Sequence, residues 1–237
     1  HRLGHSIDRI IPLFLRFLGD PTDDDESLQS EQSCELRETI LHAFESFAER
    51  CPNQVAAHME SILATVIGFM AYDPNYTYDD SDDDEEMGGS DASDEDSDEE
   101  EYDDEDYGDE DDNTWKVRRA SIKVIQAFVH SRPELLEQLY DRCTDSLVSR
   151  LKEREESVKT AVILCLEELM RVTATNSSAT RASATTSSAT ATVTTNALDK
   201  RSGSIVTSVG KLLKDKKTSV KVKTALFTLL VHFLRAL

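Results

Sequence analysis

The sequence lacks any long hydrophobic run and any motif of a familiar catalytic or nucleotide-binding site. Its richest apolar stretch, residues 225–234, is interrupted by Thr228 and His232 and falls short of the roughly 18 residues that cross a bilayer. No G-x-G-x-x-G, G-x-x-x-x-G-K-[ST], H-E-x-x-H or G-x-S-x-G pattern occurs. We therefore expect no membrane association, no catalytic residue and no cofactor, and the chain is not predicted to be an enzyme.

Paired cysteines are also missing. Cys34, Cys51, Cys143 and Cys165 are 17, 92 and 22 residues apart, without a C-x-x-C pair. All four lie within or at the ends of helical patterns. This favours reduced thiols in a cytoplasmic or nuclear protein over disulfides or zinc ligands, so no metal site is predicted.

Positive charge is absent from one long segment, which we call the acidic segment. Residues 79–112 contain 23 Asp or Glu in 34 positions and no Lys or Arg. The chain has 47 acidic residues, so 24 remain elsewhere against 26 Lys and Arg, and the formal net charge of −21 belongs to this segment. Such a segment repels itself and has little apolar surface, which predicts a disordered insert over residues 73–113. Acidophilic kinases favour a serine with an acid three residues on, which makes phosphorylation candidates of Ser81, Ser93 and Ser97.

Apolar residues outside the acidic segment recur at helical spacing. Leu36, Ile40, Ala43, Phe44 and Phe47 are three or four residues apart, as on one face of a helix. This helix is expected to end just before the proline at position 52. A second helix is predicted over residues 54–70, again with one apolar face.

A similar helix opening, an apolar residue followed by a cation, occurs four times. It begins at Leu36, Val117, Val158 and Val222, at spacings of 81, 41 and 64 residues. Without residues 73–113 and a Ser/Thr-rich stretch, residues 173–198, these spacings become 40, 41 and 38. A period near 40 with two helices per unit is typical of HEAT repeats. A globular helix bundle would explain the helices but not the equal spacing. We expect the cation of each opening to pair with a neighbouring repeat.

The predicted architecture is all-α: a right-handed α-solenoid of HEAT-type antiparallel helix pairs with two disordered inserts. The Ser/Thr-rich stretch is expected to be the second insert, because Ser and Thr weaken helices. The chain begins and ends inside apolar helical patterns, so we expect a piece of a longer protein. Its predicted parts are a helix completing an upstream repeat (1–20), a HEAT repeat (33–72), the acidic insert (73–113), a second repeat (114–153), a third repeat carrying the Ser/Thr-rich insert (154–214), and the first helix of a further repeat (215–237).

Two clusters of cations stand out from the near-neutral remainder. Arg150, Lys152 and Arg154 lie at a predicted turn between helices, which makes them candidate contacts for a protein partner. Cations at helix ends also complement the helix dipole, and this structural explanation stays open for them. It applies equally to the second cluster, at Lys211, Lys214, Lys216 and Lys217. Nucleic-acid binding is disfavoured by the net charge of −21.

Several phrases occur together in an order that resembles one family. They are DRIIPLFL at 8–15, FESF at 44–47, RCP at 50–52, YDPNY at 72–76, WKVRRA at 115–120 and SRLKERE at 149–155. Together they resemble the cullin-associated, neddylation-dissociated proteins, long HEAT solenoids also called TIP-type regulators. The resemblance extends to about residue 159 and suggests a fragment from the N-terminal to middle region of such a protein. The Ser/Thr-rich stretch departs from it.

The resemblance implies a non-enzymatic scaffold that wraps the core of a cullin–RING ubiquitin ligase, cullin plus RING subunit, when the cullin lacks its ubiquitin-like modifier. It further implies exchange of substrate-receptor modules, a monomeric state, and a location in cytoplasm and nucleus. An importin-β-like carrier of basic cargo is the alternative, since such carriers are also HEAT solenoids with an acidic loop. The length of the acidic segment and the phrase beginning at Trp115 favour the cullin regulator.

Overall fold

Successive helix pairs build the whole of the described chain. The computed structural model describes residues 6–22, 30–73, 113–182 and 188–237; the side chains of 177–182 and 188–195 are not described. No strand occurs within these ranges. The helices are α1 (Ile7–Leu18), α2 (Glu31–Arg50), α3 (Pro52–Val55), η3 (Ala56–His58), α4 (Met59–Met70), α5 (Thr114–Ser131), η5 (Pro133–Leu135), α6 (Leu136–Ser149), η6 (Arg150–Lys152), α7 (Glu156–Ala182), α8 (Ser188–Lys214) and α9 (Val220–Ala236).

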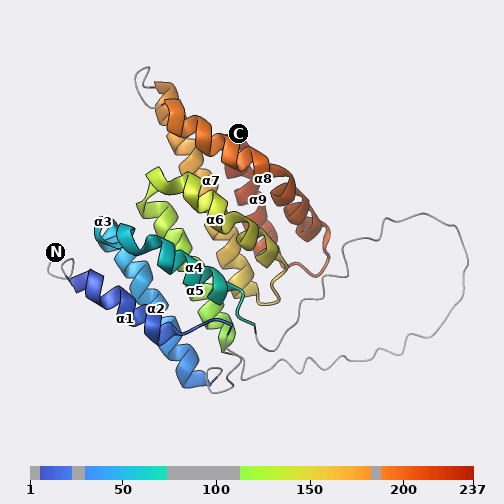
Figure 1. Ribbon diagram of the computed structural model, residues 1–237. Helices are drawn as coiled ribbons and strands as arrows, with labels where there is room; N and C mark the ends of the chain where they lie inside the picture. The colour runs from blue at the N-terminus through green and yellow to red at the C-terminus, as the bar shows by residue number, and fades with distance from the viewer. Residues whose placement is uncertain (1–5, 23–29, 74–112, 183–187) are drawn as a thin grey trace, which may run out of the picture.

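The helices form two layers. In one layer α2, α5, α7 and α9 pack side by side, and these are the most extensive contacts between elements. In the other layer α4 contacts α6 and α6 contacts α8, while α1 lies against α2 and α3 (Figure 1). Each helix therefore buries its apolar face mainly against the next repeat, which is the packing of a solenoid. The expected all-α, HEAT-type architecture is confirmed.

The proline-marked helix ends are where the sequence predicts them. The first helix of each of the two leading pairs ends just before a proline, at Arg50 and at Ser131. The predicted inward residues of the second helix, among them Val55, Ile62 and Phe69, are buried. Phe44, at the centre of α2, is fully buried. These positions confirm the 3.6-residue periodicity on which the prediction rests.

At the start of α2 the prediction of the buried face is wrong by one residue, because Arg37 is buried there and Leu36 is not. Leu36 is 50% exposed, whereas the adjacent Arg37 is only 2% exposed. The Arg37 guanidinium donates to the carbonyl of Leu18 through Nε (3.2 Å) and lies over the rings of Phe69 and Tyr72. An arginine can be buried here because its charge is hydrogen-bonded and stacked on aromatic faces.

The expected flexible insert over residues 173–198 is also wrong over the described part of that stretch. Helix α7 continues to Ala182, and α8 begins at Ser188; the residues between, 183–187, lie outside the described ranges. Both helices reach past the ends of their neighbours in Figure 1. The predicted boundaries of the acidic insert stay a prediction, because residues 74–112 are not described.

Helix persists in the Ser/Thr-rich stretch for three physical reasons. Each Ser or Thr costs a helix only a few tenths of a kcal/mol, roughly, relative to alanine, which alternates with them here. The first turns of α7 are nucleated by packing, so each added residue escapes the cost of starting a helix. The Thr173 hydroxyl donates to the Leu169 carbonyl (2.8 Å) and also meets the buried Tyr140 hydroxyl (2.9 Å) of α6.

Proline substitution tests this extension. We expect Thr175→Pro to lower the free energy of unfolding by up to about 3 kcal/mol, because it removes a helical hydrogen bond and clashes with the preceding turn. Thr175 is exposed and its hydroxyl donates to the Arg171 carbonyl (2.9 Å), so Thr175→Ala, which keeps the backbone hydrogen bond of the helix, is the matched control and should change the free energy of unfolding far less than the proline does. Urea unfolding measures both, and a harmless proline would mean that residue 175 lies in a loop.

Candidate partner-binding site

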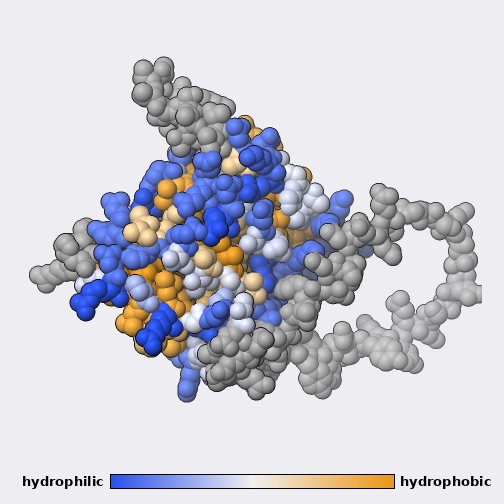
Figure 2. All heavy atoms as spheres, in the orientation of Figure 1, coloured by the Kyte–Doolittle hydropathy of each residue, from blue (hydrophilic) through white to orange (hydrophobic). Residues whose placement is uncertain are grey.

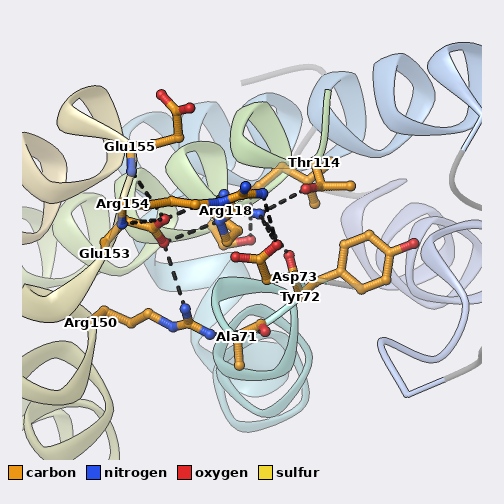
Figure 3. A network of polar contacts seen from close by, with 11 residues as sticks. Ala71, Tyr72, Asp73, Thr114, Arg118, Arg150, Glu153, Arg154 and Glu155 are labelled. Carbon is orange, nitrogen blue, oxygen red and sulfur yellow. Dashed lines mark hydrogen bonds and ion pairs between the residues drawn. The ribbon is translucent and has the colours of Figure 1, made fainter. Parts of the chain in front are cut away.

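The three candidate contact residues lie at one corner of the solenoid. Arg150 and Lys152 begin and end η6, and Arg154 follows it in the turn that leads into α7. The end of α4 and the start of α5 meet this turn, so residues far apart in sequence come together there (Figure 3). We call this group of side chains and backbone atoms, with Arg118 at its centre, the Arg118 network.

The turn itself is shaped by Glu153. Its backbone is extended (φ −51°, ψ 137°), which ends η6 after Lys152. Its carboxylate then accepts the backbone N–H groups of Arg154 (3.1 Å) and Glu155 (3.3 Å). Both N–H groups precede Glu156, the first residue of α7, so the side chain of Glu153 orders the turn that leads into this helix.

The fully buried Arg118 of α5 connects this turn to the preceding repeat. Its guanidinium donates to both carboxylate oxygens of Glu153, from Nε (3.1 Å) and from Nη2 (3.4 Å). On its other side Nη1 donates to the Tyr72 carbonyl (3.1 Å) and to the Thr114 hydroxyl (2.7 Å), and lies 3.5 Å from the Asp73 carboxylate. The planar fork of arginine permits this division of donors between two sides.

The Arg118 network holds the two flanks of the acidic segment together. Tyr72 and Asp73 are the last described residues before it, and Thr114 is the first residue of the helix that follows it. Arg118 bonds to all three. The cation of the Val117-Arg118 opening therefore pairs with a neighbouring repeat, as predicted, and it also fixes the exit and entry points of the long connection.

Two of the candidate residues are part of the same network. Arg150 is buried; its Nη2 donates to the Ala71 carbonyl (2.9 Å), and its Nη1 lies 3.6 Å from Glu153. Arg154, whose side chain is 34% exposed, donates to Asp73 (3.2 Å). Both guanidinium groups are thus engaged within the molecule, whereas Lys152 is exposed on η6.

The charges in the network nearly balance. Three guanidinium groups, those of Arg118, Arg150 and Arg154, face the two almost fully buried carboxylates of Asp73 and Glu153. A buried carboxylate is stable only when it is paired and hydrogen-bonded, and each of these two contacts two arginines. Among these five groups the positive charges outnumber the negative charges by one, and Arg154 is the member that is partly exposed to solvent.

Sequence reasoning could not find the partners in this network. The Val-Arg step marked Arg118 as a scaffold residue, but nothing in the sequence pairs it with Glu153, 35 residues away. The phosphorylation candidates Ser81, Ser93 and Ser97 lie outside the described residues. Within the described ranges, no group of three or more His, Cys, Asp or Glu side chains could hold a metal ion, and no helix is both long and apolar enough to cross a membrane.

The four cysteines are buried thiols. Burial raises the pKa of Cys143 to about 12 and that of Cys165 well above its ordinary value. Thiols with such raised pKa values form little thiolate at neutral pH and are therefore poor nucleophiles. This agrees with their expected role as apolar helix residues.

Stacked antiparallel helix pairs define the chain as a HEAT-type α-solenoid. No protein-family model matches it. It is 33% identical to a Drosophila melanogaster cullin-associated NEDD8-dissociated protein 1 over 247 aligned positions, which cover the whole chain and 17% of the relative. The Arabidopsis thaliana protein of the same name is 35% identical over 97% of the chain and 17% of its own length. A Mus musculus cullin-associated NEDD8-dissociated protein 2 is 39% identical over 73% of the chain and 13% of its own length.

These matches place the chain in the family of cullin-associated NEDD8-dissociated proteins, as a segment. It spans about a sixth of the length of the Drosophila and Arabidopsis relatives, since 17% of each is covered. The Drosophila alignment extends over the whole chain, and so past residue 159, where the resemblance of the sequence phrases ends.

Two adjacent arginines test the importance of the Arg118 network. We expect Arg118→Met to lower the free energy of unfolding by about 3–5 kcal/mol, because it leaves two buried carboxylates short of a partner. Arg119→Met should cost about 1 kcal/mol or less, because the Arg119 side chain is 32% exposed and lies 3.8 Å from its partner Glu38. Urea denaturation of both variants measures the difference, and similar losses would contradict a special role for Arg118.

Proposed function

We propose that this chain is a segment of a non-enzymatic scaffold that binds cullin–RING ubiquitin ligase cores, cullin plus RING subunit, when the cullin lacks its ubiquitin-like modifier. The observation that carries the proposal is similarity over the whole chain to a protein whose name describes association with cullins and dissociation from NEDD8. By binding the unmodified core, the scaffold would promote exchange of substrate-receptor modules. We also propose that it acts as a monomer in cytoplasm and nucleus, without binding nucleic acid or membranes.

The two-layer architecture suits this function. A solenoid presents a long surface on each layer, over which modest contacts add up to a stable complex. Exposed apolar residues occur at both ends of the stack, at Leu13 and Phe17 on α1 and at Phe227 and Leu234 on α9; an apolar area over α1 is visible in Figure 2. Neighbouring repeats would cover such residues, which supports the proposal that α1 completes an upstream repeat and α9 opens a further one.

Of the three candidate contact residues, Lys152 and the partly exposed Arg154 are the two that a partner can reach. Arg150 acts there through the fold, because its guanidinium is buried against Ala71 and Glu153. Charge reversal at Arg150 would therefore destabilise the fold. A loss of binding by that variant would not show that Arg150 contacts the partner. Lys152 can be reversed without removing any hydrogen bond of the Arg118 network.

A pull-down from the full-length protein tests the proposal. With equal amounts of modified and unmodified cullin–RING core, we expect the unmodified form to be recovered and the modified form to remain in solution. The 237-residue segment alone should recover little, because it offers only part of a distributed interface. Equal recovery of both forms by the full-length protein would contradict the proposal.

Charge reversal at Lys152 tests the contact. We expect Lys152→Glu in the full-length protein to slow association with the unmodified cullin–RING core by about threefold at low salt, with a smaller effect at high salt. Lys200→Glu, at an exposed lysine on α8, is the matched control and should leave the rate unchanged. Stopped-flow or biosensor kinetics measure both; identical rates for the two variants would remove Lys152 from the interface.

A further inference from the structure

Two serines of this chain follow a pair of adjacent cations with one residue between. Arg118-Arg119 precedes Ser121, and Lys216-Lys217 precedes Ser219. Cations two and three residues before a serine are the pattern that basophilic protein kinases select, because the substrate grooves of these kinases are acidic and substrates are discriminated by charge. By sequence alone the two serines are equivalent candidates for phosphorylation.

The structure separates the two serines. Ser121 is fully buried within α5, where its hydroxyl donates to the Val117 carbonyl (2.9 Å). The cation three residues before it is Arg118, which is held in the Arg118 network. Ser219 instead lies in the turn that joins α8 to α9 (Figure 1), and both cations before it are exposed. Of the two patterns, the second is therefore the one that a kinase can reach on the folded protein.

The residues after Ser219 can also be presented to a kinase at little cost. Val220 and Lys221 are exposed, and the first core residue of α9 is Val222. The terminal turn of a helix opens more easily than its middle. A kinase that binds residues 216–221 in extended form would thus remove no apolar side chain from the core. Lys221 adds a cation on the other side of the serine, which an acidic substrate groove also favours.

The other hydroxyl of this turn is less available. Thr218 is buried, and its hydroxyl donates to the Asp215 carboxylate (3.2 Å). Asp215 also accepts the backbone N–H of Lys217 (2.8 Å), so its carboxylate shapes the turn from inside. Ser219 is partly exposed and makes its hydrogen bond to the helix that follows, where its oxygen accepts the Val222 N–H (3.3 Å).

The start of α9 is suited to hold a phosphate once it is attached. Ser219 is the N-cap of this 17-residue helix, and N–H groups of the first turn lack acceptors within the helix. A phosphoserine brings three strong acceptor oxygens and a charge of about −1.5 to −2 at pH 7. Negative charge at a helix N-terminus is favourable, so the phosphate would reinforce the cap that the hydroxyl already provides.

Lysines surround the turn from two helices. The hydrogen bond from Lys217 is the main reason that the pKa of Asp215 is lowered, and the charges of Lys159 in α7 and Lys223 in α9 act in the same direction. The acids near the turn include Asp215 itself and Glu156, which lies 3.9 Å from a lysine of α9. These two carboxylates face five cations, which are Lys159, Lys216, Lys217, Lys221 and Lys223.

We propose that Ser219 is a phosphorylation site for a basophilic protein kinase, and that the phosphate stabilises the first turn of α9. The Ser219 oxygen attacks the terminal phosphorus of a nucleoside triphosphate held by the kinase, the bond from this phosphorus to the bridging oxygen breaks, and a nucleoside diphosphate leaves. The serine proton passes to the catalytic base of the kinase. Because α9 packs along α7, the modification acts on the junction between two repeats, and it does not depend on cullin binding.

Phosphorylation of the full-length protein with ATP tests the site. The kinase is one that phosphorylates two free peptides, residues 116–123 and residues 214–223, at comparable rates. In the native protein we expect Ser219 to be modified at least about tenfold faster than Ser121, because the latter requires unfolding of α5, and urea-unfolded protein should lose this difference. Mass spectrometry locates each phosphate. Similar rates at the two serines of the native protein, no modification of Ser219, or modification of Thr218 in its place would overturn the proposal.

Hydrogen–deuterium exchange tests the effect of the phosphate. We expect the amides of residues 222–225 to exchange about threefold more slowly in the phosphorylated protein than in the unmodified one. Ser219→Ala removes both the cap and the acceptor hydroxyl, so it should speed exchange of the same amides and leave them unaffected by treatment with the kinase. Helix α1, at the other end of the stack, is the internal reference and should not change. Unchanged or faster exchange of residues 222–225 after phosphorylation would overturn the proposal.

Discussion

One buried guanidinium, that of Arg118, is the constraint on which this part of the solenoid depends. A charge inside a protein is tolerated only when its donors are matched, and Arg118 finds acceptors on two different repeats. Its partners include the last described residues before the acidic segment, the first helical residue after it, and the turn that leads into α7. The repeats are thus aligned by a polar contact of fixed geometry as well as by apolar packing.

This arrangement explains how a long acidic insertion can interrupt a solenoid. Each helix pair is stabilised mainly by its neighbours, so a loss of alignment at one junction would propagate along the stack. Fixing both flanks at Asp73 and Thr114 keeps α4 and α5 packed regardless of how long the connection is, because loop closure depends only weakly on length. The same corner gathers cations and places Lys152 at the surface.

Much of the fold could be predicted from the sequence, because the repeat period and the apolar spacing are local properties. Phe44, Phe69 and the prolines after the first helices all lie as those patterns require. What sequence reasoning missed depends on tertiary partners. Arg37 is buried instead of Leu36 because aromatic rings of α4 and of Tyr72 receive it, and the Ser/Thr-rich stretch is helical where Thr173 bonds to Tyr140. Arg150 could not be recognised as a buried residue, since the carbonyl that accepts its donor is 79 residues away.

Hydrogen–deuterium exchange of the Arg118→Met variant tests most directly whether this one side chain couples the two repeats. Exchange reports local opening, element by element, under native conditions. We expect faster deuterium uptake in the last turn of α4 and in the turn from η6 into α7, on both sides of α5, with α9 unchanged relative to the unaltered chain. Faster uptake confined to α5, with the end of α4 and the η6 turn as protected as before, would contradict it.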